Sequence, residues 1–187
     1  MKYCSNCGSD QINFIIPEGD NYERFVCNNC KSIHYNNPRV IVGCLPIYDN
    51  KIVICKRAIE PCMGKWNLPG GFMENGERAE EGALRELKEE TGLDGDIVKL
   101  HCVYSIPHVN QVYMIFLTRI MEWNVDPGLE SLEVRLFDQH EIPWGEIGFT
   151  SSVYALEKYL ESFNPTDKKT FIGSFVMDGP ENREEYM

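Results

Sequence analysis

The sequence predicts an α/β domain that follows a small metal-bound ribbon, and three observations support this fold class. Two C-x2-C pairs lie near the start of the chain, and β-branched runs bounded by polar turns recur from residue 40 onward. Two segments, 78–91 and 151–161, space their apolar residues as amphipathic helices do. The 187 residues fit one ordinary domain plus a small appendage, at about 100–200 residues per domain.

The eight cysteines fall into two groups. Cys4 with Cys7, and Cys27 with Cys30, form two C-x2-C pairs about 20 residues apart, the spacing of a tetrathiolate zinc site. An iron site is the chief alternative, because tetrahedral sulfur geometry suits both metals. Four thiolates leave no position for water, so we expect a structural zinc ion. The others have no ligand spacing and are expected to be buried or incidental thiols: Cys44, Cys55, Cys62 and Cys102.

The first domain is expected to span residues 1–36 as a zinc ribbon. Two short strands are predicted at 11–16 and 22–26, joined by turn residues. This segment has too few apolar residues for its own core, so a metal ion must supply the missing stability. His34 follows the second cysteine pair and is expected to be a surface or linker residue.

The run Asn36-Asn37-Pro38 breaks regular structure and marks the boundary to the main domain. We expect this domain to span residues 37–164. A C-terminal tail should occupy residues 165–187, where a charged run is typical of disorder. Four apolar residues in the tail could still dock on the domain: Phe171, Ile172, Phe175 and Val176.

Strand and helix signals alternate along the main domain. Residues 40–48 and 51–56 are β-branched runs joined by the turn pair Asp49-Asn50, which predicts a hairpin. The last helix, 151–161, begins with a serine cap. Further strands are expected at 97–104, 112–120 and 134–137.

The helix predicted at 78–91 carries apolar residues on one side and carboxylates on the other. Glu86, Glu89 and Glu90 stand at i, i+3 and i+4, which places three carboxylates on one face. Gly82 is a mild flaw in the helix interior, since glycine is a poor helix former. The apolar stripe consists of Ala79, Ala83, Leu84 and Leu87.

Three carboxylates on one helix face require an explanation, because like charges at this spacing repel by roughly 0.2–0.5 kcal/mol per pair. One explanation is an acidic solvated face, partly relieved by Arg85 pairing with Glu81 or Glu89. The other is a cluster of hard oxygen ligands for Mg²⁺ or Mn²⁺.

The residues around this helix resemble the complete Nudix signature. Gly71 and Glu77 precede the helix at the required spacing. The resemblance to the Nudix family covers residues 39–162, and the cysteine pairs together with Asn37-Pro38 resemble its zinc-ribbon branch. The run that fills the remaining fixed positions is Arg85-Glu86-Leu87-Lys88-Glu89-Glu90-Thr91-Gly92-Leu93.

The resemblance implies an α/β/α sandwich around a mixed sheet, with a loop–helix–loop that binds divalent cations. It also implies that Glu77 holds Arg85, which in turn orients the glutamates. The implied ligands of Mg²⁺ or Mn²⁺ are Glu86, Glu89, Glu90 and the backbone carbonyl of Gly70.

The implied reaction is in-line attack of water on a phosphorus of a diphosphate, which releases a nucleoside monophosphate. Divalent cations lower the pKa of a bound water and neutralise charge on the phosphoryl oxygens. The general base is less certain from sequence, because some relatives use a glutamate of the signature and others a distal loop glutamate. Glu130 and Glu133 are the loop candidates, of which we favour Glu130; the alternative is that both are ordinary surface charges.

ADP-ribose and FAD are the substrates that the resemblance favours, with AMP as product. The alternatives are NADH, a dinucleoside polyphosphate or a nucleoside triphosphate, and a sensor that binds nucleotide without cleaving it. His108-Val109-Asn110 replaces the Trp-Pro-Phe-Pro type sequence of relatives that cleave NADH, and the intact glutamates argue against a sensor. Arg57, Trp66 and Tyr104 are candidate substrate contacts, although most rings are expected in the core. Other rings considered for stacking are Tyr113, Phe116 and Trp144.

The net charge of −11 opposes binding of a long nucleic acid, so we expect a small nucleotide as partner. Divalent cations allow an acidic protein to bind such an anion. The start of the chain lacks a secretory or transit signal and no segment suggests a membrane span, so we expect a cytoplasmic protein. Relatives commonly form homodimers, but no part of this sequence identifies an interface.

Overall fold

A computed structural model describes residues 1–161 and 169–176, and the backbone of 183–186. The chain divides into two compact units, Met1–Pro38 and Arg39–Met187. This division follows the last residue of the Asn36-Asn37-Pro38 break, whereas the sequence placed it two residues earlier, after Asn36.

The first unit is a three-stranded antiparallel sheet in the order β1-β2-β3. Phe14 and Phe25 pack across the sheet with ring centroids 4.8 Å apart. The buried side chains of this unit are Cys4, Pro17 and Cys27, which is too little apolar surface for an independent core. The strands are β1 (Ile12–Ile15), β2 (Arg24–Cys27) and β3 (Ile33–His34), the last of which the sequence did not indicate.

The second unit is built on a mixed sheet in the order β10-β5-β4-β9-β8-β11-β12, with β6 paired to β5 and β7 paired to β4. The pairs β4–β9 and β8–β11 are parallel, and the other pairs are antiparallel. The strands are β4 (Arg39–Tyr48), β5 (Lys51–Arg57), β6 (Trp66–Asn67), β7 (Gly70–Phe72), β8 (Gly95–Ile106), β9 (Gln111–Ile120), β10 (Ser131–Phe137), β11 (Phe171–Val176) and β12 (Arg183–Tyr186).

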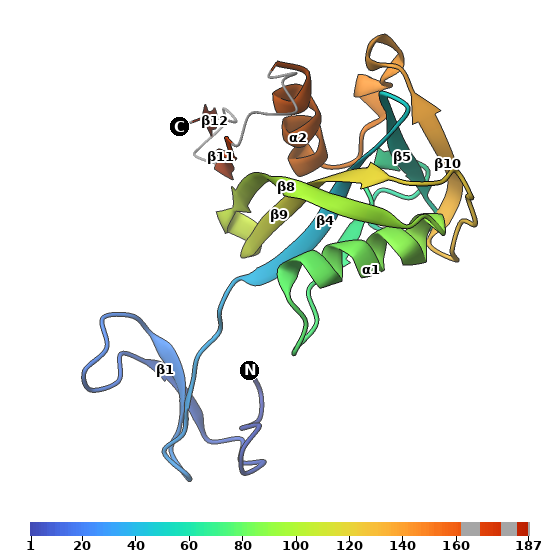
Figure 1. Cartoon of the computed structure of the whole chain (residues 1–187). Helices are drawn as coiled ribbons and strands as arrows, with labels where there is room; N and C mark the ends of the chain where they lie inside the picture. The colour runs from blue at the N-terminus through green and yellow to red at the C-terminus, as the bar shows by residue number, and fades with distance from the viewer. Residues whose placement is uncertain (162–168, 177–182, 187) are drawn as a thin grey trace. The chain divides into compact units, whose positions relative to one another are not determined.

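One helix covers each face of this sheet (Figure 1). Alternation along β5 separates the two cores: Ile52 and Ile54 pack in the cluster that contains α2, while Val53 packs in the cluster that contains α1. This arrangement confirms the expected α/β/α sandwich.

No helix in the described part of the chain is long and apolar enough to cross a membrane. The helices are α1 (Ala79–Thr91) and α2 (Thr150–Glu161), with short 3-10 turns η1 (Pro107–Val109), η2 (Gln139–Glu141) and η3 (Trp144–Glu146).

The C-terminal segment differs from the separate tail expected at 165–187. Residues 171–176 form β11, which pairs in parallel with β8, and β12 pairs with β11. Gly173 lies against the ring of Tyr154 in α2, so the apolar residues of this segment extend the sheet. Residues 162–168, 177–182 and 187 lie outside the described part of the chain.

Two short strands between β5 and α1 position the start of the signature. Asn67 on β6 pairs with Cys55, and Gly70 and Gly71 on β7 pair with Gly43 and Val42 of the central strand β4. Pairing of β7 with β4 holds the loop before α1 against the middle of the sheet.

Candidate active site and thiolate cluster

Helix α1 presents the three signature glutamates because its opposite side is anchored in the core. Ala83 and Leu87 are fully buried against β4 and β5. The helix ends at Gly92, which adopts the left-handed conformation with φ 74° and donates its N–H to the Lys88 carbonyl. These contacts fix the rotation of the helix about its axis, and so fix where its carboxylates point.

Arg85 connects three carboxylates around the start of this helix. It forms a two-pronged ion pair with Glu77, with N···O distances of 3.1 and 3.0 Å. Its Nη1 donates to Glu86 at 2.7 Å and to Glu89 at 3.0 Å, and its Nη2 donates to the Phe72 carbonyl at 3.2 Å. The expected pairing of Glu77 with Arg85 is therefore present.

The signature carboxylates differ in burial. Glu90 is only 6% exposed, the Glu86 side chain is 13% exposed, and the Glu89 side chain is 59% exposed. Burial, followed by the charge of Glu86, raises the pKa of Glu90 to about 8, while the charge of Arg57 acts in the opposite direction. Burial also raises the pKa of Glu86.

A divalent cation suits this carboxylate cluster. No ion pair to Glu90 is formed by the residues that the structure describes. The charge of Glu86 raises the pKa of the buried Glu90 carboxylate, which has no ion pair of its own, and hard cations prefer such oxygen donors. A Cβ on Gly71 would lie 2.6 Å from the Glu86 carboxylate, so a larger residue at this position would require the Glu86 side chain to move.

These residues line a cavity of about 700 Å³. Its wall combines the signature residues with side chains from β4, β5, β6 and β9, with Phe149 just before α2, and with the loop that carries Glu130. The lining residues are Ile41, Arg57, Ile59, Glu60, Pro61, Asn67, Gly70, Gly71, Phe72, Glu74, Arg85, Glu86, Glu89, Glu90, Gln111, Tyr113, Leu129, Glu130 and Phe149.

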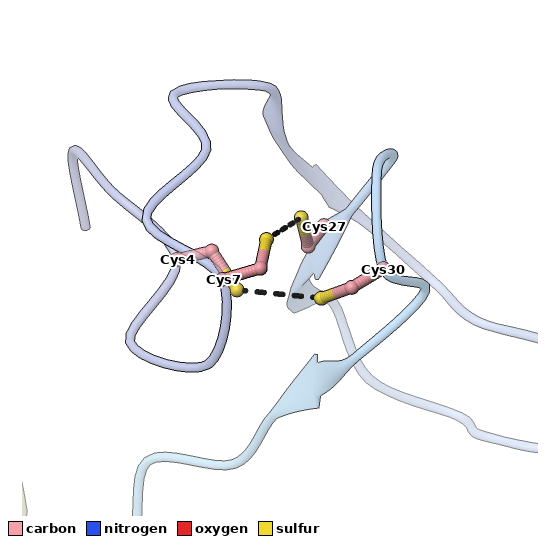
Figure 2. Close-up of side chains that lie close together, drawn as sticks. All are labelled: Cys4, Cys7, Cys27 and Cys30. Atoms are coloured by element: carbon pink, nitrogen blue, oxygen red, sulfur yellow. Dashed lines mark hydrogen bonds between the residues drawn. The ribbon is translucent and has the colours of Figure 1, made fainter.

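The thiolate cluster lies in the first unit. Figure 2 shows the four side chains converging from two loops, with sulfur distances of 3.6 Å for Cys4–Cys30 and 3.6 Å for Cys7–Cys27. All four ligand atoms lie within 4.8 Å of one another. A tetrahedral ion with bonds of about 2.3 Å requires sulfur atoms about 3.8 Å apart, so this donor set fits zinc.

Two polar neighbours complete the cluster. A hydrogen bond with the Ser32 side chain lowers the pKa of Cys30 to about 5, which favours the thiolate that binds metal. His34 was expected to be a linker residue, but its Nε2 lies 3.3 Å from the Cys4 sulfur and its Nδ1 lies 3.4 Å from the Ser5 hydroxyl. The strand β3, which the sequence did not indicate, brings the imidazole to the cluster.

Comparison with known families agrees with this geometry. A model of the NUDIX domain matches residues 37–156, and a model described as Nudix N-terminal matches residues 2–36. The chain belongs to the Nudix family. It carries the family's N-terminal zinc ribbon, as the cysteine pairs predicted, and Nudix hydrolases cleave nucleotide derivatives with the help of divalent metal ions.

Three proteins illustrate the similarity. The crystal structure of a NUDIX hydrolase from Nitrosomonas europaea is 47% identical, with a TM-score of 0.88 over 93% of this chain and 98% of that one. An ADP-ribose pyrophosphatase from Methanocaldococcus jannaschii is 37% identical over 58% of this chain and 67% of its own length. The NAD-capped RNA hydrolase NudC of Vibrio atlanticus is 27% identical over 76% of this chain and 51% of its own length.

Of the expected substrate contacts, the structure brings Arg57 to the cavity of this Nudix domain. Its Nε donates to the Pro61 carbonyl at 2.8 Å, and its guanidinium lies 5.2 Å from the centre of the Phe149 ring. Tyr113, one of the other rings considered, also lines the cavity. Arg57 lies on β5 and Tyr113 on β9, the two strands that flank β4 in the sheet.

Trp66 and Tyr104 do not line this cavity, which corrects the expected substrate contacts. Trp66 is 5% exposed and packs edge-on against Phe137, with ring centroids 5.0 Å apart. Tyr104 is fully buried, 4.8 Å from the ring of Tyr154 in α2. Helix α2 covers these rings, and its position over the sheet could not be derived from the sequence.

The two candidates for the general base differ in their position relative to the cavity. Glu130 lines the cavity, and its charge contributes to the raised pKa of Glu86 and of Glu90. Glu133 lies on β10 and is absent from the cavity wall. The Glu130 carbonyl accepts a hydrogen bond from Ala58 at 2.8 Å, which fixes the loop next to β5.

Several cavity residues were not singled out from the sequence, among them Phe72, Gln111 and Phe149. Phe72 follows the glycine pair of the signature, and that adjacency was the one local signal available. Gln111 and Phe149 come from the start of β9 and the residue before α2, so their proximity to the glutamates depends on the tertiary fold.

Gly82 offers a test of the packing around Glu77. Alanine usually stabilises a helix interior by about 1 kcal/mol relative to glycine, but here its Cβ would overlap Glu77 Oε1 and lie 2.9 Å from Val42 Cγ2. We expect Gly82→Ala to lower the free energy of unfolding by about 1–3 kcal/mol in urea titrations. Gly145→Ala, where nothing lies within 4 Å, should leave stability nearly unchanged. A stabilised Gly82→Ala variant would contradict this packing.

Proposed function

We propose that this Nudix protein hydrolyses the diphosphate linkage of ADP-ribose or FAD and releases AMP. The observation that supports this most directly is the cavity of about 700 Å³ that joins the carboxylate cluster to Arg57, Tyr113 and Phe149. The carboxylates suit a metal-bound diphosphate, and the rings suit a planar base. The archaeal relative named an ADP-ribose pyrophosphatase supports the same substrate class.

Glu86, Glu89, Glu90 and the backbone carbonyl of Gly70 are the proposed ligands for Mg²⁺ or Mn²⁺. When bound, such ions would supply positive charge to the diphosphate oxygens and a more acidic water. Glu90 and Glu86 provide a recessed, preformed pair of donors, while the more exposed Glu89 lies nearer to the solvent.

Arg85 and Glu77 are proposed to orient these ligands. Arg85 restricts the rotamers of Glu86 and Glu89 through its hydrogen bonds at 2.7 and 3.0 Å. Glu77 holds the guanidinium from the other side and is itself fixed by the Glu74 N–H at 2.7 Å. Each carboxylate is thus held before substrate arrives, which lowers the cost of reaching the reactive geometry.

Glu130 is proposed as the general base. Its carboxylate would take a proton from water as the water oxygen bonds to the phosphorus of the AMP moiety. The bond from that phosphorus to the bridging oxygen then breaks, and ribose 5-phosphate or FMN leaves. Arg57 would contact the negatively charged phosphate oxygens from the β5 side of the cavity.

NADH is the second candidate substrate. The relative named NudC aligns over 76% of this chain, whereas the His108-Val109-Asn110 segment argues against NADH. In the structure Pro107–Val109 form the turn η1, and none of these residues lines the cavity.

Substrate preference can be measured with a panel of ADP-ribose, FAD, NADH, diadenosine polyphosphates and nucleoside triphosphates, each with Mg²⁺ and with Mn²⁺. We expect AMP to appear from ADP-ribose or FAD in clear preference. Glu90→Gln keeps the shape of the buried side chain but removes its charge, and should lower kcat by more than about 100-fold. If no substrate of the panel is hydrolysed, a nucleotide sensor is favoured. Full activity of Glu90→Gln would contradict the role of Glu90 as a metal ligand.

The role of Glu130 can be separated from that of its neighbour. We expect Glu130→Gln to lower kcat by about 100-fold or more, because general base catalysis typically contributes that much. Glu133→Gln removes an equal charge from the adjacent strand outside the cavity and should retain activity. Equal effects of the two substitutions on kcat would show that only overall charge matters.

The ribbon is proposed to hold one structural zinc ion through Cys4, Cys7, Cys27 and Cys30. Elemental analysis of the purified chain should find about one zinc per chain, and Cys27→Ser should lose it, because this sulfur is fully buried at the centre of the cluster. Cys62→Ser is a control outside the cluster. Iron in place of zinc, or zinc retained in Cys27→Ser, would contradict the assignment.

A further inference from the structure

Asn67 is a buried amide in the wall of the cavity, and the proposed reaction does not yet use it. It is 7% exposed and lies on β6, next in sequence to the core residue Trp66. Asn67 lines the same cavity as Gly70 and Glu90.

Ser152 of helix α2 fixes the orientation of this amide. Its Oγ donates to Asn67 Oδ1 at 2.5 Å and accepts a hydrogen bond from the Leu68 N–H at 3.5 Å. Since the hydroxyl carries a single proton, accepting from Leu68 leaves that proton for the Asn67 carbonyl oxygen. Ser152 is itself 3% exposed, so water does not compete freely for the bond.

The amide nitrogen of Asn67 can consequently donate a hydrogen bond to a group in the cavity. Within residues 1–161 and 169–176, no group accepts a hydrogen bond from Asn67 Nδ2. This nitrogen is not among the fully buried side-chain atoms that lack a partner, so it is accessible from the cavity, where a ligand acceptor can take the place of water. A ligand with an acceptor atom at this position would therefore complete the site.

Gln111 repeats this arrangement at another point of the cavity wall. The Tyr113 hydroxyl donates to Gln111 Oε1 at 3.0 Å, which occupies the carbonyl oxygen of that amide. Burial raises the pKa of Tyr113, so the phenol stays protonated and remains a donor. Both amides of the cavity thus offer N–H groups, in contrast to the acceptor-only carboxylates of α1.

We propose that Asn67, held by Ser152, is a substrate-binding residue that donates a hydrogen bond to an acceptor atom of the nucleotide. Asn67 would touch the substrate, and Ser152 would act as a positioning residue through it. The inference rests on the proposed function, because it assumes that a nucleotide enters this cavity. The acceptor belongs to the phosphate or to the nucleoside, and the two sources can be distinguished.

Binding of ADP-ribose to the full chain, measured by calorimetry in buffer without divalent metal, tests the donor without turnover. We expect Asn67→Ala to weaken binding by about tenfold, the typical loss for one hydrogen bond to a charged or strongly polar acceptor. Asn67→Asp replaces the donor by an acceptor of the same shape and should weaken binding further. Wild-type affinity in both variants would overturn the role of Asn67.

A double-mutant cycle tests whether Ser152 acts through Asn67. We expect Ser152→Ala to weaken binding several-fold in the wild type, and to have no further effect in the Asn67→Ala background. Ser152→Thr, which keeps the hydroxyl, should restore affinity. The matched control is Ser151→Ala, which removes a neighbouring buried hydroxyl that does not bond to Asn67. The same loss in both backgrounds would show a purely structural effect.

AMP and adenosine identify the source of the acceptor. A loss confined to AMP in Asn67→Ala assigns the acceptor to the phosphate, and equal losses assign it to the nucleoside. ADP-ribose could bind in a way that depends on Asn67 and yet not be hydrolysed when Mg²⁺ or Mn²⁺ is added. That result would overturn the proposed activity alone. Absence of any binding of ADP-ribose and AMP, both in metal-free buffer and with Mg²⁺ added, would overturn both proposals.

Discussion

The ion pairs of Arg85 are the constraint on which the active-site geometry depends. One guanidinium contacts Glu77 before the helix, Glu86 and Glu89 on it, and the Phe72 carbonyl at the end of β7. The hydrogen bonds that Arg85 donates to Glu77 raise the pKa of Arg85, so its charge is permanent. Because it joins a strand, a loop and a helix, the residue couples the shape of the backbone to the placement of the carboxylates.

The sandwich around these ion pairs makes it possible to bury carboxylates. Ala83 and Leu87 fix α1 against β4 and β5, and the fully buried residues of both strands form a rigid floor. Burial disfavours the charged form of the Glu90 carboxylate. A helix held only by its own hydrogen bonds would therefore rotate and expose Glu90 to water. Core packing therefore maintains an electrostatic strain that a divalent cation is suited to relieve.

Local features were predictable from the sequence and long-range ones were not. Spacing within short segments was enough to predict the helix at 78–91, the paired cysteines and the contact between Glu77 and Arg85. The strand β11 and the placement of α2 depend on partners far along the chain, and so did the exclusion of Trp66 and Tyr104 from the cavity. No signal in the sequence indicated β6, and only the fold shows that Asn67, and not Trp66, lies in the cavity wall.

The register of the central strand has a consequence for the order of folding. Arg39–Tyr48 pairs in parallel with Gln111–Ile120, so one edge of the first strand of the Nudix domain has no partner until a segment synthesised much later is available. Such distant pairing slows folding, because the intervening loop must close before contacts form. The ribbon has all four thiolates within Cys4–Cys30, so on the ribosome it can capture its metal while the catalytic sheet is still incomplete.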